Sequence, residues 1–171
     1  QSGAVQQLTN NDFEDIAPDF SPDGKQIAYS ANPKGAYDLF LLDVDTLQIR
    51  TLLADSADKT EPVWSPDGKF IAFQSNAYGD NDINIISLED GSVERLTEED
   101  SQDTQASWQS DGKNLVFVSD RDGDFDIFSL NIATREVKQL MNNQYYDASP
   151  VCSPNGEKIA LLLKMIDDNR S

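Results

Sequence analysis

The chain has 171 residues, of which 38% are hydrophobic, and this length suits one domain with a buried core. Its formal net charge of −18 at pH 7 repels nucleic acid and anionic lipid and attracts cations and basic partners, so nucleic-acid binding is excluded. The sequence has no histidine and one cysteine, Cys152, which excludes a Ser-His-Asp triad, a His-ligated zinc site and an internal disulfide.

The start of the chain has neither the basic residues nor the apolar run of a signal peptide. If the protein is exported, its signal has been removed. No window approaches the roughly 18 apolar residues of a membrane span, so no membrane insertion is expected. Residues 1–3 and 170–171 are interpreted as candidate remnants of an expression tag.

A 44-residue repeat runs through the sequence. The dipeptide Asp-Gly, or its relative Asn-Gly, recurs at this step four times, starting at positions 23, 67, 111 and 155. Other columns of similar residues keep the same step: Phe20, Trp64, Trp108 and Cys152; Gly35, Gly79 and Gly123; Asp38, Asp82 and Asp126; Leu8, Leu52, Leu96 and Leu140. A repeat of about 40–45 residues with four strands per unit is typical of a β-propeller blade.

Each unit predicts four strands, which we name A to D in chain order. Strand A ends at the aromatic column and leads into the Asp-Gly turn, for which we predict type I′ geometry, with positive φ at both central residues. Strand B covers residues 27–30, 70–75, 115–119 and 159–163. Strand C starts at the aligned aspartates. Strand D covers 49–53, 93–97 and 137–141, and residues 5–9 match it.

The predicted fold is an all-β propeller of four-stranded blades, about three and a half per chain. One domain covers residues 5–163, with blades over 10–53, 54–97 and 98–141, a partial blade over 142–163 and a D strand over 5–9. An antiparallel sandwich is the alternative, which the constant period disfavours.

The run Glu61-Pro-Val-Trp-Ser-Pro-Asp-Gly-Lys-Phe-Ile-Ala-Phe73 resembles the repeat of TolB-type propellers, as does the run from Ser119 to Phe128. The resemblance covers nearly the whole chain and departs from the pattern at Gln109-Ser110, at Cys152 and at residues 155–157. It implies a ring of blades around a central channel and a periplasmic or other extracytoplasmic location. It also implies a scaffold or gate whose chemistry, where present, lies in another domain.

Three and a half blades are too few for an ordinary closed propeller, and an open arc would expose strand edges. We therefore expect either a fragment of a longer propeller or a homo-oligomer. In the oligomer, residues 5–9 of one chain would complete the last blade of another, giving a ring of about eight blades in a dimer.

The D–A and B–C connections share one face of a propeller, here called the acidic loop face. Fifteen acidic residues fall there against Lys34, Lys59 and Arg121. The acids are Asp12, Glu14, Asp15, Asp55, Asp58, Glu61, Asp80, Glu98, Glu99, Asp100, Asp103, Asp120, Asp122, Asp124 and Asp147. With aromatic anchors Tyr37, Tyr78, Phe125 and Tyr146, this face predicts a protein or basic-peptide partner. A solvated surface that keeps the protein soluble is the alternative.

One column, Asp15, Lys59, Asp103 and Asp147, stands at the start of each innermost strand. These residues are expected to ring the mouth of the channel. The resemblance to TolB-type propellers implies that partner peptides enter there.

Asp120, Asp122 and Asp124 alternate around Gly123 and resemble an acidic calcium loop. The twelfth position holds Asn131 instead of glutamate, so no cofactor is expected and calcium is the alternative. The favoured interpretation is that Asp126 binds backbone amides of the B–C turn, and that Arg121 pairs with a neighbouring aspartate.

These observations predict a non-catalytic binding or scaffold module, and no catalytic residue is singled out. One alternative is the gating propeller of a larger serine peptidase or another envelope enzyme, which a Gly-x-Ser-x-Gly motif in a longer parent sequence would favour. Another is a purely architectural, self-assembling half-propeller.

Overall fold

The computed structural model describes residues 5–143 and 145–165. The candidate tag remnants, residues 1–3 and 170–171, lie outside the described residues. Within them, every regular element is a β-strand and no helix has the length and apolar content to cross a membrane. This confirms the predicted all-β class.

The strands form four antiparallel sheets in chain order, which are the blades. Blade 1 contains β1 (Asp15–Phe20), β2 (Gln26–Ala31), β3 (Asp38–Asp43) and β4 (Ile49–Leu53). Blade 2 contains β5 (Lys59–Trp64), β6 (Phe70–Ser75), β7 (Asp82–Ser87) and β8 (Val93–Arg95). Blade 3 contains β9 (Asp103–Trp108), β10 (Asn114–Ser119), β11 (Asp126–Asn131) and β12 (Val137–Gln139). Blade 4 is partial, with β13 (Tyr145–Cys152) and β14 (Ile159–Met165).

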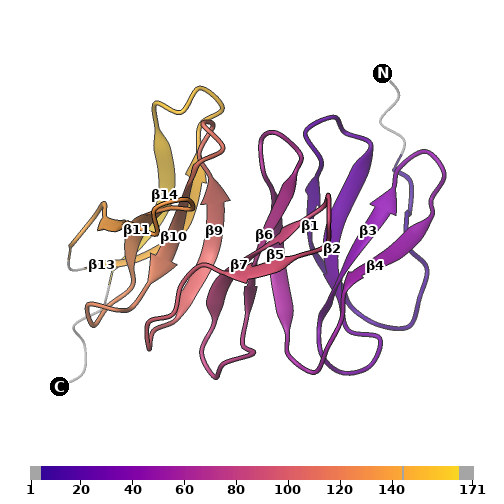
Figure 1. The fold of residues 1–171 in the computed structure, drawn as a ribbon, viewed down its shortest axis with the longest axis horizontal. Helices are drawn as coiled ribbons and strands as arrows, with labels where there is room; N and C mark the ends of the chain where they lie inside the picture. Colours follow the sequence, from indigo (N-terminus) through magenta and orange to yellow (C-terminus); the bar gives the residue numbers. More distant parts are fainter. Residues whose placement is uncertain (1–4, 144, 166–171) are drawn as a thin grey trace.

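The blades stand side by side in chain order across the molecule (Figure 1). The first strand of each later blade packs on the preceding blade: β5 contacts β1, β2 and β3, and β9 contacts β5, β6 and β7. β13 repeats this arrangement against β9, β10 and β11. The result is a propeller arc of about three and a half blades, as the repeat predicts.

Apolar residues between neighbouring blades form the core. Trp64 packs with Leu39 and Leu41 of blade 1 and with Phe73 of its own blade, and Trp108 occupies the corresponding place between blades 2 and 3. Both tryptophans are 8% exposed, whereas Phe20, in the same column of the repeat, is 59% exposed. The difference arises because no described blade precedes blade 1.

Hydrogen bonds at a regular sequence separation also join the blades. The backbone N–H groups of Lys59, Asp103 and Asp147 donate to the carbonyls of Tyr37, Asn81 and Phe125 in the preceding blade at 2.8, 2.8 and 2.9 Å. The Asp19 carboxylate accepts from the Trp64 N–H at 2.7 Å, and the Gln105 amide oxygen accepts from the Ser149 N–H at 2.7 Å. These bonds fix the first strand of each blade against its predecessor.

The Asp-Gly turns differ from the predicted type I′ geometry. Gly24 has a φ of 71°, but Asp23 is not among the residues with positive φ, and the same holds in the other three units. The Gly24 N–H donates to the Ser21 carbonyl, and the Ser21 N–H to the Gln26 carbonyl, both at 2.8 Å. The loop is therefore four residues long, and only glycine takes the left-handed conformation, as expected after an ordinary turn.

Residues 5–9 form no strand in this structure, contrary to the predicted D strand. A D strand needs a C strand beside it to share hydrogen bonds, and the described residues place none there. Leu8 nevertheless packs on Ile27, Tyr29 and Leu42 of blade 1. β8 and β12 are also shorter than predicted. After β8, Leu96 and Thr97 both donate to the Ile83 carbonyl, and after β12, Leu140 and Met141 both donate to the Ile127 carbonyl, so the regular ladder ends there.

Candidate partner-binding face

The connections of the acidic loop face follow β2, β4, β6, β8, β10 and β12, and antiparallel order places them on one side of the arc. Two of the three basic residues on this face are neutralised within the chain. Lys59 forms an ion pair with Asp55, and Arg121 forms one with Asp103. These pairs leave the net charge of the face unchanged, but Lys34 is then the one basic residue of this set without an ion pair among the described residues.

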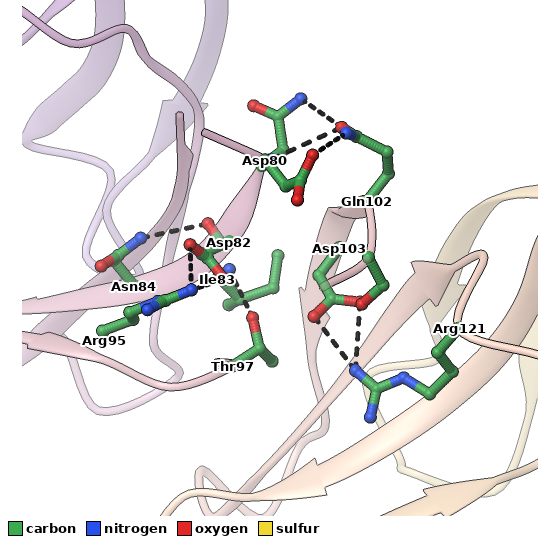
Figure 2. A network of polar contacts seen from close by, with 11 residues as sticks. Asp80, Asp82, Ile83, Asn84, Arg95, Thr97, Gln102, Asp103 and Arg121 are labelled. Atoms are coloured by element: carbon green, nitrogen blue, oxygen red, sulfur yellow. Dashed lines mark hydrogen bonds and ion pairs between the residues drawn. The ribbon is translucent and has the colours of Figure 1, made fainter. Parts of the chain in front are cut away.

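Arg121 forms an ion pair with the buried carboxylate of Asp103 through one nitrogen that contacts both oxygens (Figure 2). The Arg121 Nη2 atom lies 3.1 and 3.0 Å from the two carboxylate oxygens of Asp103, which is 0% exposed. The guanidinium also lies over the rings of Phe117 and Phe128, at 5.4 and 5.0 Å from their centroids. The predicted pairing of Arg121 with an aspartate is confirmed, and it ties the loop after β10 to the start of β9.

The structure places the predicted channel-mouth column beneath the surface. Lys59 is 1% exposed, and Asp103 and Asp147 are 0% exposed. The Asn143 amide donates to both Asp147 oxygens at 3.1 and 3.0 Å. Asp15, which is partly exposed, accepts from the Asn11 amide at 2.9 Å. The three buried members have partners within the chain and hold the loops in place, so their direct contact with a binding partner stays a prediction.

Asp80, Asp100 and Asp120 lie close together near Gln102, which is in the loop between β8 and β9. Figure 2 shows Asp80 beside Gln102. The Gln102 amide donates to Asp80 at 2.9 Å, and its backbone N–H donates to Asp120 at 2.7 Å. Hydrogen bonding to Asp100, then partial desolvation and the charges of Asp100 and Asp120, raise the pKa of Asp80 above its usual value. This part of the face therefore has a local excess of negative charge.

We expect Asp80→Asn to raise the melting temperature at pH 7. The raised pKa means that folding disfavours the ionised form of Asp80, so the charge of Asp80 lowers the free energy of unfolding at neutral pH. This destabilisation disappears as the pH falls below the ordinary pKa of 3.8, where Asp80 is protonated in both the folded and the unfolded chain. Asparagine keeps the oxygen that accepts from Gln102.

Thermal unfolding of wild type and Asp80→Asn at pH 7 and near pH 3 measures this effect. Asp12→Asn serves as the control, because Asp12 is an exposed acid on the same face. A gain of equal size at both pH values, or in both variants, would contradict the repulsion between the carboxylates.

In blades 2 and 3, the aspartate that begins the C strand binds a side chain of strand D. Arg95 pairs with Asp82 at 2.9 Å, and the Gln139 amide donates to Asp126 at 2.9 Å. The prediction that Asp126 binds backbone amides of the B–C turn missed this partner. The sequence did contain the signal, because Thr51, Arg95 and Gln139 form one column of the repeat.

Three of the predicted aromatic anchors, Tyr37, Tyr78 and Phe125, lie in the B–C loops of blades 1 to 3, and Tyr146 lies in β13 of the partial blade. Phe125 and Tyr146 pack together with ring centroids 4.7 Å apart, and Tyr78 stacks on the Arg95 guanidinium at 4.4 Å. The Tyr37 hydroxyl donates to Glu14 at 2.6 Å, and this bond raises the pKa of Tyr37. Only Tyr78, at 68% exposed, projects far into solvent.

The calcium interpretation of Asp120, Asp122 and Asp124 gains no geometric support. Among the residues that the structure describes, no group of three or more acidic or Cys side chains converges as a metal site would require. Asp120 instead accepts from the Gln102 N–H. Calcium stays a prediction without a structural basis.

The sequence model of the TolB beta propeller domain matches residues 1–161. The chain belongs to the TolB β-propeller family. This confirms the resemblance seen in the repeat. None of the curated proteins that were compared matches the chain.

Solved structures agree with this TolB-type fold. TolB from Acinetobacter baumannii has 27% identity and a TM-score of 0.83, over 95% of this chain and 41% of that one. An oligogalacturonate lyase from Vibrio parahaemolyticus has 16% identity and a TM-score of 0.75, over 95% of this chain and 50% of the lyase. A puromycin-hydrolyzing peptidase from Mycobacterium tuberculosis has 16% identity and a TM-score of 0.72, over 89% and 28%.

The chain thus spans about half or less of the length of these three proteins. At 16% identity, the likeness to the two enzymes concerns the fold alone. The TolB-type repeat explains the regular placement of the buried aspartates.

Proposed function

We propose that this TolB-type propeller is a non-catalytic module that binds a protein or peptide carrying basic residues on its acidic loop face. The single observation that carries the proposal is the charge of that face. The face has fifteen acidic residues and three basic ones, and two of the basic residues, Lys59 and Arg121, are already paired within the chain. Such a field attracts and orients a basic partner and raises its association rate.

The geometry gives less support to catalysis. Burial is the main cause of the raised pKa of Asp82 and Asp126, and each of these aspartates binds a side chain of strand D. An acidic face also disfavours an anionic substrate such as the oligogalacturonate of the similar lyase, because like charges repel. A gating role within a larger peptidase is the second candidate, and the fold likeness to a puromycin-hydrolyzing peptidase favours it.

Two further proposals concern the location and the oligomeric state. Resemblance to TolB supports an extracytoplasmic location, in the periplasm or elsewhere in the cell envelope. The homo-oligomer stays a prediction, which exposed apolar residues on the partial blade support: Val151, Leu162 and Leu163 are 60, 65 and 54% exposed. Light scattering of the purified chain, giving either one or two chain masses, decides between monomer and dimer.

Binding of basic peptides tests the proposed function. Fluorescence anisotropy would measure the affinity of equal-length peptides that differ only in their number of lysine and arginine residues, at low and high salt. We expect affinity to rise with peptide charge and to fall with salt, because the Debye length shortens from about 30 Å at 0.01 M to about 8 Å at 0.15 M.

Two triple variants with the same charge change locate the binding face. Glu98→Gln with Glu99→Gln and Asp100→Asn removes three of the fifteen acidic charges of the acidic loop face, and we expect binding to weaken roughly fivefold to tenfold. Asp45→Asn with Glu89→Gln and Glu136→Gln neutralises three exposed acids near the C–D turns on the opposite side. An equal loss of affinity in both variants would show that binding depends on net charge alone and not on this face. If the chain binds none of the peptides, the proposal is wrong.

A further inference from the structure

The aspartate that begins the C strand lacks its strand-D partner in blade 1. In blade 2 this aspartate pairs with Arg95, and in blade 3 it accepts from Gln139. The blade 1 member, Asp38, is 6% exposed, and its Oδ1 atom is buried with no hydrogen-bond partner. Asp82 and Asp126 also have one buried oxygen without a hydrogen bond, but each accepts from a strand-D side chain through its other oxygen. Among the described residues no side chain donates to Asp38, so blade 1 alone leaves this carboxylate without a donor, and a ligand with N–H groups would supply one.

The missing partner has a simple cause in the sequence. Thr51 faces Phe40 across the ladder between β3 and β4, as Arg95 faces Asn84 between β7 and β8. The two residues therefore hold the same structural position. A threonine side chain is too short to reach the carboxylate that the arginine reaches in blade 2, and the described residues supply no substitute.

An open cavity of about 550 Å³ lies beside Asp38, between the B–C loop of blade 1 and the start of its D–A loop. Lys34, Asp38, Ala54, Asp55 and Ser56 line it. Asp55 is already paired with Lys59. Among the described residues, no ion pair joins Lys34 to Asp38. Asp38 is thus the one lining carboxylate whose charge is not matched within the described part of the chain.

We propose that this cavity, the Asp38 cavity, binds the guanidinium group of an arginine from the basic partner. The inference rests on the proposed function, because it names the side chain that the acidic loop face takes. Blade 2 shows the contact: the Arg95 Nη2 atom lies 2.9 Å from both Asp82 oxygens. A planar guanidinium fits a carboxylate better than an ammonium does, since its N–H groups match two acceptors.

The first experiment titrates the folded chain with a single blocked arginine, N-acetyl-arginine amide, followed by two-dimensional NMR. We expect saturable shifts of the Gly35 and Ala36 amides, which line the cavity. Blocked citrulline has the same shape without the charge, and its affinity is expected to be about tenfold lower, as is typical for loss of a charge-assisted hydrogen bond.

Variants assign the effect to Asp38. Asp38→Asn should weaken the binding of blocked arginine about tenfold, while Asp45→Asn, an equal charge change at an exposed site on the other face, should not change it. Thr51→Arg places the chain's own guanidinium where blade 2 has Arg95 and should abolish the shifts. Because Thr51 is exposed, this variant tests the site even if Asp38→Asn fails to fold.

The outcomes separate this inference from the proposed function. If blocked arginine gives no saturable shifts, or binds Thr51→Arg as well as wild type, the Asp38 cavity is not an arginine site. In that case, binding of basic peptides would still support the proposed function. Conversely, the chain could bind blocked arginine saturably and yet bind no basic peptide. The Asp38 cavity would then be an arginine site, and the proposal that the acidic loop face binds a partner would be wrong.

Discussion

Replacing Trp108 with alanine is expected to lower the free energy of unfolding by about 4 kcal/mol, or roughly 10 °C in melting temperature. The indole is 8% exposed, fills the space between blades 2 and 3, and donates its Nε1–H to the Val63 carbonyl at 3.1 Å. Truncation would leave a cavity at the blade interface and an unpaired carbonyl. Chemical denaturation followed by circular dichroism measures the loss.

Phe20→Ala is the matched control, because Phe20 holds the same position of the repeat in blade 1. It is 59% exposed, so its truncation should change the free energy of unfolding by less than about 1 kcal/mol. Similar losses in the two variants would mean that the tryptophan acts within its own blade, and the view that blades are stabilised by their neighbours would be wrong.

Arg121→Met is expected to destabilise the chain by about 3 kcal/mol. Methionine keeps much of the apolar stem that packs over Phe117 and Phe128, but Asp103 would be left as a buried carboxylate without its cation. Asp103 is 0% exposed, and Ser101, whose hydroxyl donates to it at 3.2 Å, cannot replace the charge. The same denaturation measurement applies.

Two further variants identify the cause. Arg50→Met removes an equal charge from an exposed site on β4 and should have little effect. The double variant Asp103→Asn/Arg121→Met should recover part of the loss, because the uncompensated carboxylate is then absent. If the double variant is less stable than Arg121→Met, the ion pair is not the source of the stability.

Much of the architecture could be predicted from the sequence, because the repeat fixes it. The spacing of Asp38, Asp82 and Asp126 located the start of each C strand, and the aromatic column located the interfaces between blades. The repeat did not predict the turn geometry, since Asp-Gly occurs in several turn types and the length of the loop decides which one forms. The prediction of a strand over residues 5–9 was also wrong, because a strand needs a neighbouring strand to bond to and not only a suitable local pattern.

The candidate site was harder to predict. Sequence position placed Lys59, Asp103 and Asp147 near the channel mouth, but it could not show that their side chains turn inward and are satisfied by Asp55, Arg121 and Asn143. Pairing with Arg121 was foreseeable from charge. The unpartnered state of Asp38 was not, because it depends on which residue of strand D faces it. Comparing Thr51 with Arg95 across the repeat could have revealed it.

The hydrogen bonds between blades have a consequence for how such a chain can change length. Each backbone bond from Lys59, Asp103 or Asp147 reaches back 22 residues, to Tyr37, Asn81 or Phe125. A duplication or deletion of one whole 44-residue unit leaves that separation intact at every remaining junction. A change of length by this period would therefore preserve the backbone bonds between blades, whereas the side-chain contacts, which differ from one junction to the next, would have to fit anew.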